Sequence, residues 1–218
     1  MTRHLQADLR LPVGSAVLAW RRGPSVWRWQ AGAARLGEGT TPSLPRTGFS
    51  LRGSGNSFAV WPWLSLLSSE EDRGTWPEIR FDLHWRHLLL FEQDWPDVRM
   101  RGQVAAENLH LQLTGPQVVG ALQYTRAVPP ADSAQLRLDI QKLRIAAPSS
   151  PQVPPAGLPQ TLGEATGSPL ALHAHVAQLD WRGHKVQDVL LDAGRSATGW
   201  KIAMIKGDWA GSQWDFQG

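Results

Sequence analysis

Apolar and polar residues alternate one for one along most of the chain, and this period of two constrains the fold more than any other feature. The alternation is clearest where Leu109, Leu111 and Leu113 are separated by His110 and Gln112. Successive side chains of a β-strand point to opposite faces of its sheet, so a period of two is typical of a strand with one buried face. The sequence therefore predicts an all-β chain of mostly antiparallel strands, each with an apolar and a polar face.

One interruption of this pattern has helical character. Asn56 and Ser57 are residue types that cap helices, and Pro62 suits a first helical turn. An apolar stripe follows, made of Trp63, Leu64, Leu66 and Leu67. A short helix is therefore expected near 60–69. The remaining strand-like runs of the chain are residues 13–20, 26–30, 49–53, 79–85, 98–101, 109–113, 118–124, 136–140, 170–177, 189–191, 200–204 and 209–216.

Prolines divide the chain into three regions. Residues 148–169 contain six prolines in a tract rich in Ser, Gly and Thr, and a β-ladder does not persist at that proline density. This tract is expected to be a loop or linker. We expect residues 1–147 to form a first β-meander region with the short helix, and residues 170–218 to begin a second meander that is truncated.

The two meanders resemble each other at a fixed shift. Asp97-Val98 and Asp188-Val189 lie 188 − 97 = 91 residues apart, and the same shift pairs His84 with His175. Apolar positions keep their phase at this shift, since Leu109, Leu111 and Leu113 correspond to Trp200, Ile202 and Met204. Stacked copies of one meander form an extended array, so the sequence predicts an extended, curved sheet or groove built from repeated units.

The composition excludes several classes of function. The chain has no cysteine, which excludes disulfides, thiolate metal sites and cysteine nucleophiles. Its net charge is only +3, and no run of Lys and Arg suggests nucleic-acid binding. No stretch approaches the ~18 apolar residues of a membrane-spanning helix, and the N-terminus lacks the apolar region of a signal peptide.

Histidine and carboxylate residues could carry chemistry, but each group has a simpler interpretation. His173 and His175 lie on one face of a strand and could bind a metal with His184 or Asp188, but neutral histidines of a polar face are the favoured interpretation. No catalytic motif surrounds His84, and the carboxylate run at 70–72 is typical of a solvated loop. We expect no catalytic residue, no metal and no cofactor, and therefore no enzyme.

Several short motifs follow one another in a characteristic order. They are Trp27-Arg28-Trp29, the run 48–53, the run 63–67, the run 179–189, the run 199–202 and Trp209-Ala210-Gly211. In this order they resemble the later part of the long periplasmic region of YhdP-type AsmA-like proteins, over about the whole chain. The resemblance implies an inner-membrane anchor, a long periplasmic β-structure and phospholipid traffic toward the outer membrane. The anchor is missing here, and the strand pattern reaches Gly218 without a stop, so we expect a fragment of a longer protein.

The expected function is to shelter or conduct phospholipid between the inner and outer membranes through an apolar β-groove. Acyl chains need a continuous dry surface and few hydrogen bonds, so no chemical motif is required. Its partners are phospholipid acyl chains and, through the missing anchor, the membrane; nucleic acid is not expected. The residues expected to face lipid are Ile79, Phe81, Leu83, Leu109, Leu111, Leu113, Leu170, Leu172, Val176, Trp200, Ile202 and Met204.

A second hypothesis starts from the tryptophans. The chain has 12 tryptophans and one tyrosine, and exposed indoles recognise sugars and proteins. A β-sandwich module that binds an envelope polysaccharide or protein would place two or three of them side by side, next to Asp, Asn or Gln. A lipid groove would instead line one continuous face with tryptophan and leucine.

Overall fold

The chain forms one β-sheet. The computed structural model describes residues 4–23, 26–59, 77–90, 93–127, 133–145, 170–196 and 199–217. All thirteen strands in these ranges belong to a single sheet, and none of these residues is helical. The predicted all-β, mostly antiparallel fold is therefore confirmed. The helix expected at 60–69 and the proline-rich tract at 148–169 lie outside the described residues.

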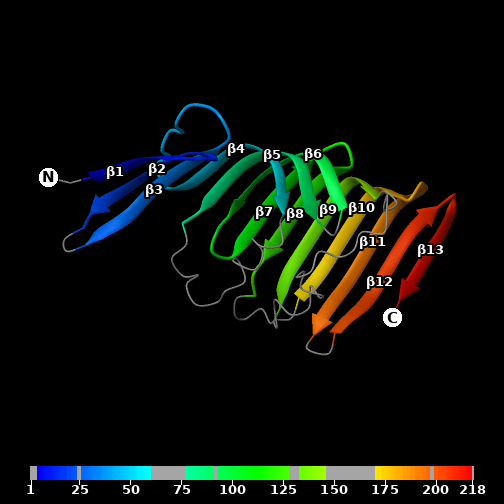
Figure 1. Cartoon of the computed structure of the whole chain (residues 1–218). Helices are drawn as coiled ribbons and strands as arrows, with labels where there is room; N and C mark the ends of the chain where they lie inside the picture. The colour runs from blue at the N-terminus through cyan, green and yellow to red at the C-terminus, as the bar shows by residue number, and fades with distance from the viewer. Residues whose placement is uncertain are drawn as a thin grey trace.

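The strands lie side by side in the order in which they occur in the sequence, with the two termini at opposite ends of the row (Figure 1). The first six are β1 (His4–Leu11), β2 (Gly14–Arg22), β3 (Trp27–Leu36), β4 (Gly48–Ala59), β5 (Ile79–Leu90) and β6 (Gln93–Val104). The others are β7 (Asn108–Thr114), β8 (Val118–Thr125), β9 (Ala134–Ile145), β10 (Leu170–Trp181), β11 (His184–Ser196), β12 (Gly199–Trp209) and β13 (Ser212–Gln217).

Three neighbouring pairs are parallel, and the rest are antiparallel. The parallel pairs are β3 with β4, β4 with β5, and β9 with β10. A tight turn cannot join parallel strands, because the second strand must begin at the edge of the sheet where the first began. The longest connections of the chain, residues 37–47, 60–78 and 146–169, join these pairs. The proline tract therefore belongs to the crossover between β9 and β10.

The parallel pair β9 and β10 joins the two predicted meander regions. Leu172 of β10 lies opposite Leu136 of β9, and Val176 lies opposite Ile140. The strands of both regions are thus neighbours in one sheet. The described strands make no second layer, so they do not form the β-sandwich of the second hypothesis.

The two sides of the sheet differ in polarity. Paired residues share a side, so the register assigns every paired position to one face. We call the side that carries Leu83, Leu111 and Leu172 the apolar face, and the side that carries His84 and His173 the polar face. The main core lies on the apolar face of β5 to β8 and consists of Leu83, Trp85, Leu88, Trp95, Val98, Met100 and Val118.

The hairpin β5–β6 recurs as β10–β11 in the same register. Trp85 pairs with Val98 and Leu88 with Trp95 in the first hairpin. At a shift of 91 residues, the second hairpin pairs Val176 with Val189 and Leu179 with Val186. The strand β10 also begins and ends 91 residues after β5, since 79 + 91 = 170 and 90 + 91 = 181. The repeat predicted from the sequence is therefore a structural repeat.

Both hairpins contain an irregularity at the same place, which we call the crease. It comprises residues 86–87 and 96–97 in the first hairpin and residues 177–178 and 187–188 in the second. Asp97 and Asp188 have φ angles of 57° and 47°, in the left-handed region that most side chains avoid. The pairing register is the same on both sides of the crease, since Trp85 pairs with Val98 and Leu88 with Trp95. Both strands therefore change phase together, and apolar residues spaced three apart, such as Trp85 and Leu88, lie in one core.

We predict that the left-handed conformation makes Asp97 and Asp188 sensitive to alanine. Asp97→Ala and Asp188→Ala should each lower the free energy of unfolding by about 1 kcal/mol, because alanine lacks the short polar side chain with which Asp and Asn tolerate this region. Asp97→Asn should cost much less, because asparagine tolerates the left-handed region. Urea denaturation of the four proteins, including wild type, measures the difference. Equal stability of the Ala and Asn variants at position 97 would show that the left-handed conformation does not set the stability of this site.

Candidate functional site

Most of the residues expected to face lipid share one side of the sheet. The register places them on the apolar face, where cross-strand rows join them, as in the row Val104, Leu109 and Tyr124. The residues so placed are Ile79, Phe81, Leu83, Leu109, Leu111, Leu113, Leu170, Leu172, Val176, Trp200 and Ile202. Their contact with lipid remains a prediction.

Met204 is the exception, and its expected placement was wrong. Ile202 pairs with Ala193, but Met204 pairs with Asp192, because β12 contains one extra residue at this point. Oδ1 of Asp192 lies 2.7 Å from Nδ1 of His173, whose N–H it can accept, so Asp192 lies on the polar face. The bulge moves Met204 to that face and brings Ile205, opposite Leu191, to the apolar face instead.

The apolar face is continuous across the sheet. In the described strands β4 to β13, the paired positions of this face carry Leu, Ile, Val, Phe, Trp, Ala, Met and Gly almost throughout. Its polar residues are at strand ends, such as Tyr124, His184 and Ser212. The only permanently charged residue among these positions is Arg195, near the end of β11. The middle of every strand is thus free of charge on this side.

All tryptophans of the described residues lie on the apolar face. The register places on one side Trp20, Trp27, Trp29, Trp85, Trp95, Trp181, Trp200, Trp209 and Trp214. The sequence could have indicated this shared face, because each tryptophan can be compared with the alternation of the leucines in its own strand.

Glycines on adjacent strands make room for two of these indoles. A Cβ atom added to Gly55 would meet the ring of Trp85, and one added to Gly207 would meet the ring of Trp214. Gly55 pairs with Trp85 across β4 and β5, and Gly207 pairs with Trp214 across β12 and β13. Each indole therefore lies over a glycine of the next strand. The indole occupies the space that a side chain at the glycine position would otherwise fill.

We predict that Gly55→Val displaces Trp85 from its place. The new side chain would overlap the indole, which also stacks on Phe58 with ring centroids 4.7 Å apart. Overpacking of this kind costs about 1–3 kcal/mol in stability. Denaturant unfolding and the emission spectrum of the tryptophans measure it. Gly194→Val is the matched control, because a Cβ at Gly194 meets nothing within 4 Å; equal losses in the two variants would contradict the prediction.

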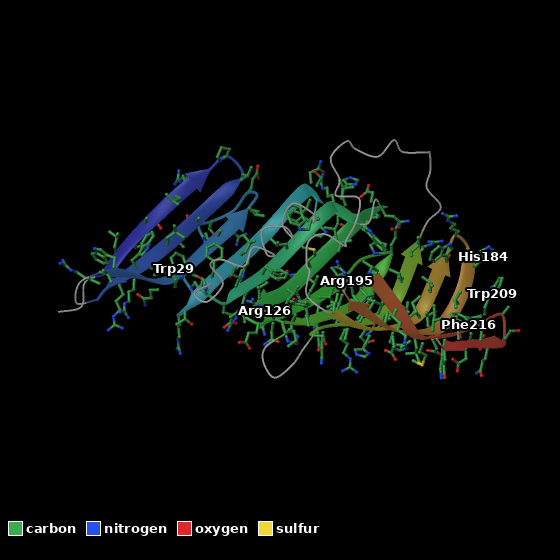
Figure 2. The ribbon with its side chains drawn as sticks, turned by 90° about the horizontal axis from the view of Figure 1, so that it is seen from below. Trp29, Arg126, His184, Arg195, Trp209 and Phe216 are labelled. Carbon is green, nitrogen blue, oxygen red and sulfur yellow. The ribbon has the colours of Figure 1, made fainter. Side chains whose placement is uncertain are left out.

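The apolar face is closed in the first repeat and open in the second. Leu83 is 5% exposed within the core, and Val98 is fully buried. In the second repeat, Trp200, Ile202 and Trp209 are 49%, 52% and 54% exposed. Some of the predicted residues are thus packed against the protein itself, whereas those of β12 are accessible to a ligand. Figure 2 shows Trp209 and Phe216 among the side chains of the last strands.

Ion pairs cover the polar face of β5 and β6. Both guanidinium nitrogens Nε and Nη2 of Arg99 donate to the carboxylate of Asp82 at 2.8 Å, and Nε of Arg101 lies 3.2 Å from it. The hydrogen bonds from Arg99 hold the pKa of Asp82 below its ordinary value, against a smaller opposing effect of burial. The pair therefore stabilises the fold above the ordinary pKa of aspartate, and this contribution is lost as the pH falls through the lowered pKa. Partly exposed ion pairs of this kind are typical of a sheet face that is open to water.

The histidines considered as metal ligands or catalysts pair with aspartates of neighbouring strands. His84 lies 2.8 Å from Asp97, and the equivalent His175 lies 3.7 Å from Asp188. His184 lies on the other face, where its ring meets the edge of Trp209 at 5.8 Å, so it is not brought together with His175. Within the described residues, no group of three or more His, Asp or Glu side chains is arranged to hold a metal ion. The carboxylate run at 70–72 lies outside these residues.

The chain matches a known protein family over nearly its whole length. A model of a protein family described as "YhdP protein" matches residues 2–218. No curated protein and no solved structure matches the chain. In the part of the chain that the structure describes, no helix is long and apolar enough to cross a membrane. Since the match spans nearly every residue of the sequence, the chain belongs to the YhdP protein family.

Proposed function

We propose that this chain is a non-catalytic segment of an envelope protein that shelters or conducts phospholipid along its apolar face. The observation that carries the proposal is the unbroken apolar face of β4 to β13, whose paired positions are uncharged except at Arg195. An acyl chain gains ~0.8 kcal/mol for each methylene group that it removes from water. A surface of this kind suits it without any specific hydrogen bond.

The open part of the face makes the proposal more specific. Trp181, Trp200, Ile202, Trp209 and Phe216 are each about half exposed or more. Exposed apolar residues that gather on one surface mark sites of interaction with a ligand, a membrane or another protein. We propose that β10 to β13 accept the acyl chains, and that the packed core of β5 to β8 is the closed part of the same surface.

Membership of the YhdP family supports the envelope as the place of action. We propose that the segment lies in the periplasm and works in a longer parent protein anchored in the inner membrane. In that setting the apolar face would shield lipid between the two membranes. The polar face, with its pairs of Asp82 with Arg99 and His173 with Asp192, would face water.

The alternative, recognition of an envelope polysaccharide or protein through tryptophans, has less support. A sugar site combines aromatic rings with carboxylate or amide groups. On the apolar face the paired neighbours of Trp200 and Trp209 are Arg195, Val186 and Ser212. The paired neighbours of these two tryptophans thus include none of the Asp, Asn and Gln side chains that would bind sugar hydroxyls.

Native mass spectrometry of the purified chain tests the proposal. We expect wild-type protein expressed in a bacterial periplasm to retain phospholipid, visible as discrete mass increments that disappear on delipidation. Reloading with a phospholipid of known mass should restore the expected increment. Protein that neither retains nor reloads phospholipid under conditions that preserve its β-sheet circular dichroism would contradict the proposal.

A further inference from the structure

Two buried polar atoms on the polar face of β2 and β3 have no hydrogen-bond partner. Oγ of Ser15 and Nε of Arg35 are both buried, and no donor or acceptor in the described part of the chain bonds to either. Ser15 of β2 is paired with Arg35 of β3, so the two side chains are neighbours on one side of the sheet. Buried polar atoms are normally hydrogen-bonded, so two adjacent exceptions point to a binding site.

A second arginine lies beside this pair. Arg35 is paired with Arg52 of β4, and Arg52 with Asp82 of β5, which places the row on the polar face. Neighbouring strands lie about 4.8 Å apart, so the two arginine side chains start close together and their charges repel each other. This arrangement is unfavourable for the protein alone and favourable for an anion.

The nearest carboxylate in the register is already engaged. Asp82 lies opposite Arg52, but its ion pairs are with Arg99 and Arg101. Within the strands that the structure describes, none of the ion pairs includes Arg35 or Arg52. The charges of these two arginines are therefore not neutralised by the described residues.

On the other side of Ser15, β1 contributes one charge of each sign. Arg10 is paired with Ser15, and Asp8 is paired with Val17, one row further along the strands. Asp8 accepts a hydrogen bond from Nε2 of Gln6 at 3.3 Å. Arginines thus flank Ser15 and Arg35 along their own row, whereas the carboxylate belongs to the next row.

The crossover that joins β3 to β4 lies against Arg35 (Figure 1). A Cβ atom added to Gly39 of this crossover would lie 3.1 Å from both Cδ and Nη1 of Arg35. Arg35 is therefore half-buried and held in place, while Arg52 is exposed and accessible from solvent. Glu38, next to this glycine, is exposed and forms none of the ion pairs above.

We propose that Ser15, Arg35 and Arg52 bind a phosphate group on the polar face of β2 to β4. The N–H donors of arginine match the oxygens of a phosphate, and a serine hydroxyl can donate to a third oxygen. A bound phosphate gives the two buried atoms their hydrogen bonds and lies between the two like charges. The shared chemistry is a phosphate with three terminal oxygens, either free or as the monoester of a larger molecule. The site is on the face opposite to the proposed lipid surface and is independent of it.

Titration with small anions tests this site. Isothermal titration of the whole chain at constant ionic strength compares inorganic phosphate, glycerol 3-phosphate and acetate. The variants are Arg35→Gln and Ser15→Ala. Arg137→Gln is the matched control, because it removes the same charge from the polar face at β9, where Arg137 is paired with His173 of β10.

Wild type and Arg137→Gln should bind phosphate with equal affinity. Arg35→Gln should weaken binding by at least about ten-fold, because it removes a charge-assisted hydrogen bond, and Ser15→Ala by about three-fold. Tighter binding of glycerol 3-phosphate would support a monoester as the ligand, and tighter binding of inorganic phosphate would support the free anion. No binding by wild type, or equal affinity of wild type and Arg35→Gln, would overturn the site. Acetate that binds as tightly as both phosphates would overturn the assignment to phosphate.

A second measurement distinguishes a ligand site from a structural arginine. Without phosphate, Arg35→Gln should be at least as stable in urea as wild type, because it removes an unpaired charge. Saturating phosphate should stabilise wild type more than Arg35→Gln, since a ligand that binds the folded state raises its stability. General effects of the salt act on both proteins alike. An Arg35→Gln variant that is less stable than wild type by the same amount with and without phosphate would overturn the inference.

Discussion

Ile202→Asp should abolish retention of phospholipid while the protein still folds. Ile202 lies on the apolar face of β12 and is 52% exposed, so a carboxylate there stays in contact with water when no lipid is bound. A bound acyl chain would remove that water. An unpaired charge in an apolar environment costs several kcal/mol, which corresponds to a loss of affinity of at least about a hundred-fold.

The neighbouring residue provides a matched control for this variant. Lys201 lies on the polar face, opposite Gly194, and is exposed. Lys201→Asp introduces the same side chain one position away in the same strand, and should retain lipid as wild type does. Native mass spectrometry at equal protein concentration compares the two variants, and circular dichroism verifies that both remain folded.

Leu172→Asp extends the test to β10. A charged substitution at His173, which lies on the polar face of the same strand, is its control. Leu172 is half-buried between Leu136 and Ala193, so this variant also probes packing. Retention of lipid by both apolar-face variants would contradict the proposed surface. If Leu172→Asp unfolds the chain, Ile202→Asp and the milder Ile202→Ser still decide the question, because their site is open to solvent.

Leu88→Ala should lower the free energy of unfolding by about 3 kcal/mol, within the range of about 2–5 kcal/mol for buried leucines. Leu88 is 1% exposed and belongs to the core of β5 to β8, where it pairs with Trp95. The truncation removes the packing contacts of the leucine side chain. It also leaves a cavity, because β5 is hydrogen-bonded to β4 and β6 and cannot move to fill the space.

The structural repeat supplies the control for this prediction. Leu179 is the counterpart of Leu88 at the shift of 91 residues, and it pairs with Val186 as Leu88 pairs with Trp95. Leu179 is only partly buried, so Leu179→Ala should cost less than half as much. Urea denaturation of both variants measures the difference. Equal losses would show that the two repeats pack alike, contrary to the closed and open parts described above.

Local patterning was enough to predict the fold class and the repeat. The alternation at Leu109, Leu111 and Leu113 is a property of each strand alone, because neighbouring side chains of an extended chain point in opposite directions whatever lies beside them. The shift of 91 residues was visible for the same reason, since equivalent strands need the same apolar phase. The aspartates that marked it, Asp97 and Asp188, occupy equivalent left-handed positions.

The placement of Met204 could not be predicted from alternation. A period of two counts residues along one strand and assumes that none is extra. The bulge in β12 exists only in relation to β11, where Asp192 and Ala193 pair with residues two positions apart, Met204 and Ile202. Whether a strand contains an extra residue is decided by its hydrogen-bonded neighbour, so the sequence of β12 alone assigned Met204 to the wrong face.

By itself, the sequence determined that this chain forms strands, that each strand has an apolar side, and that one unit recurs. The tertiary structure decided that β9 and β10 join both units in one sheet, that every described tryptophan shares a face, and that Leu83 is buried whereas Ile202 is open. The reason is physical: the direction of a side chain follows from the local backbone, but pairing and burial depend on strands distant in the sequence.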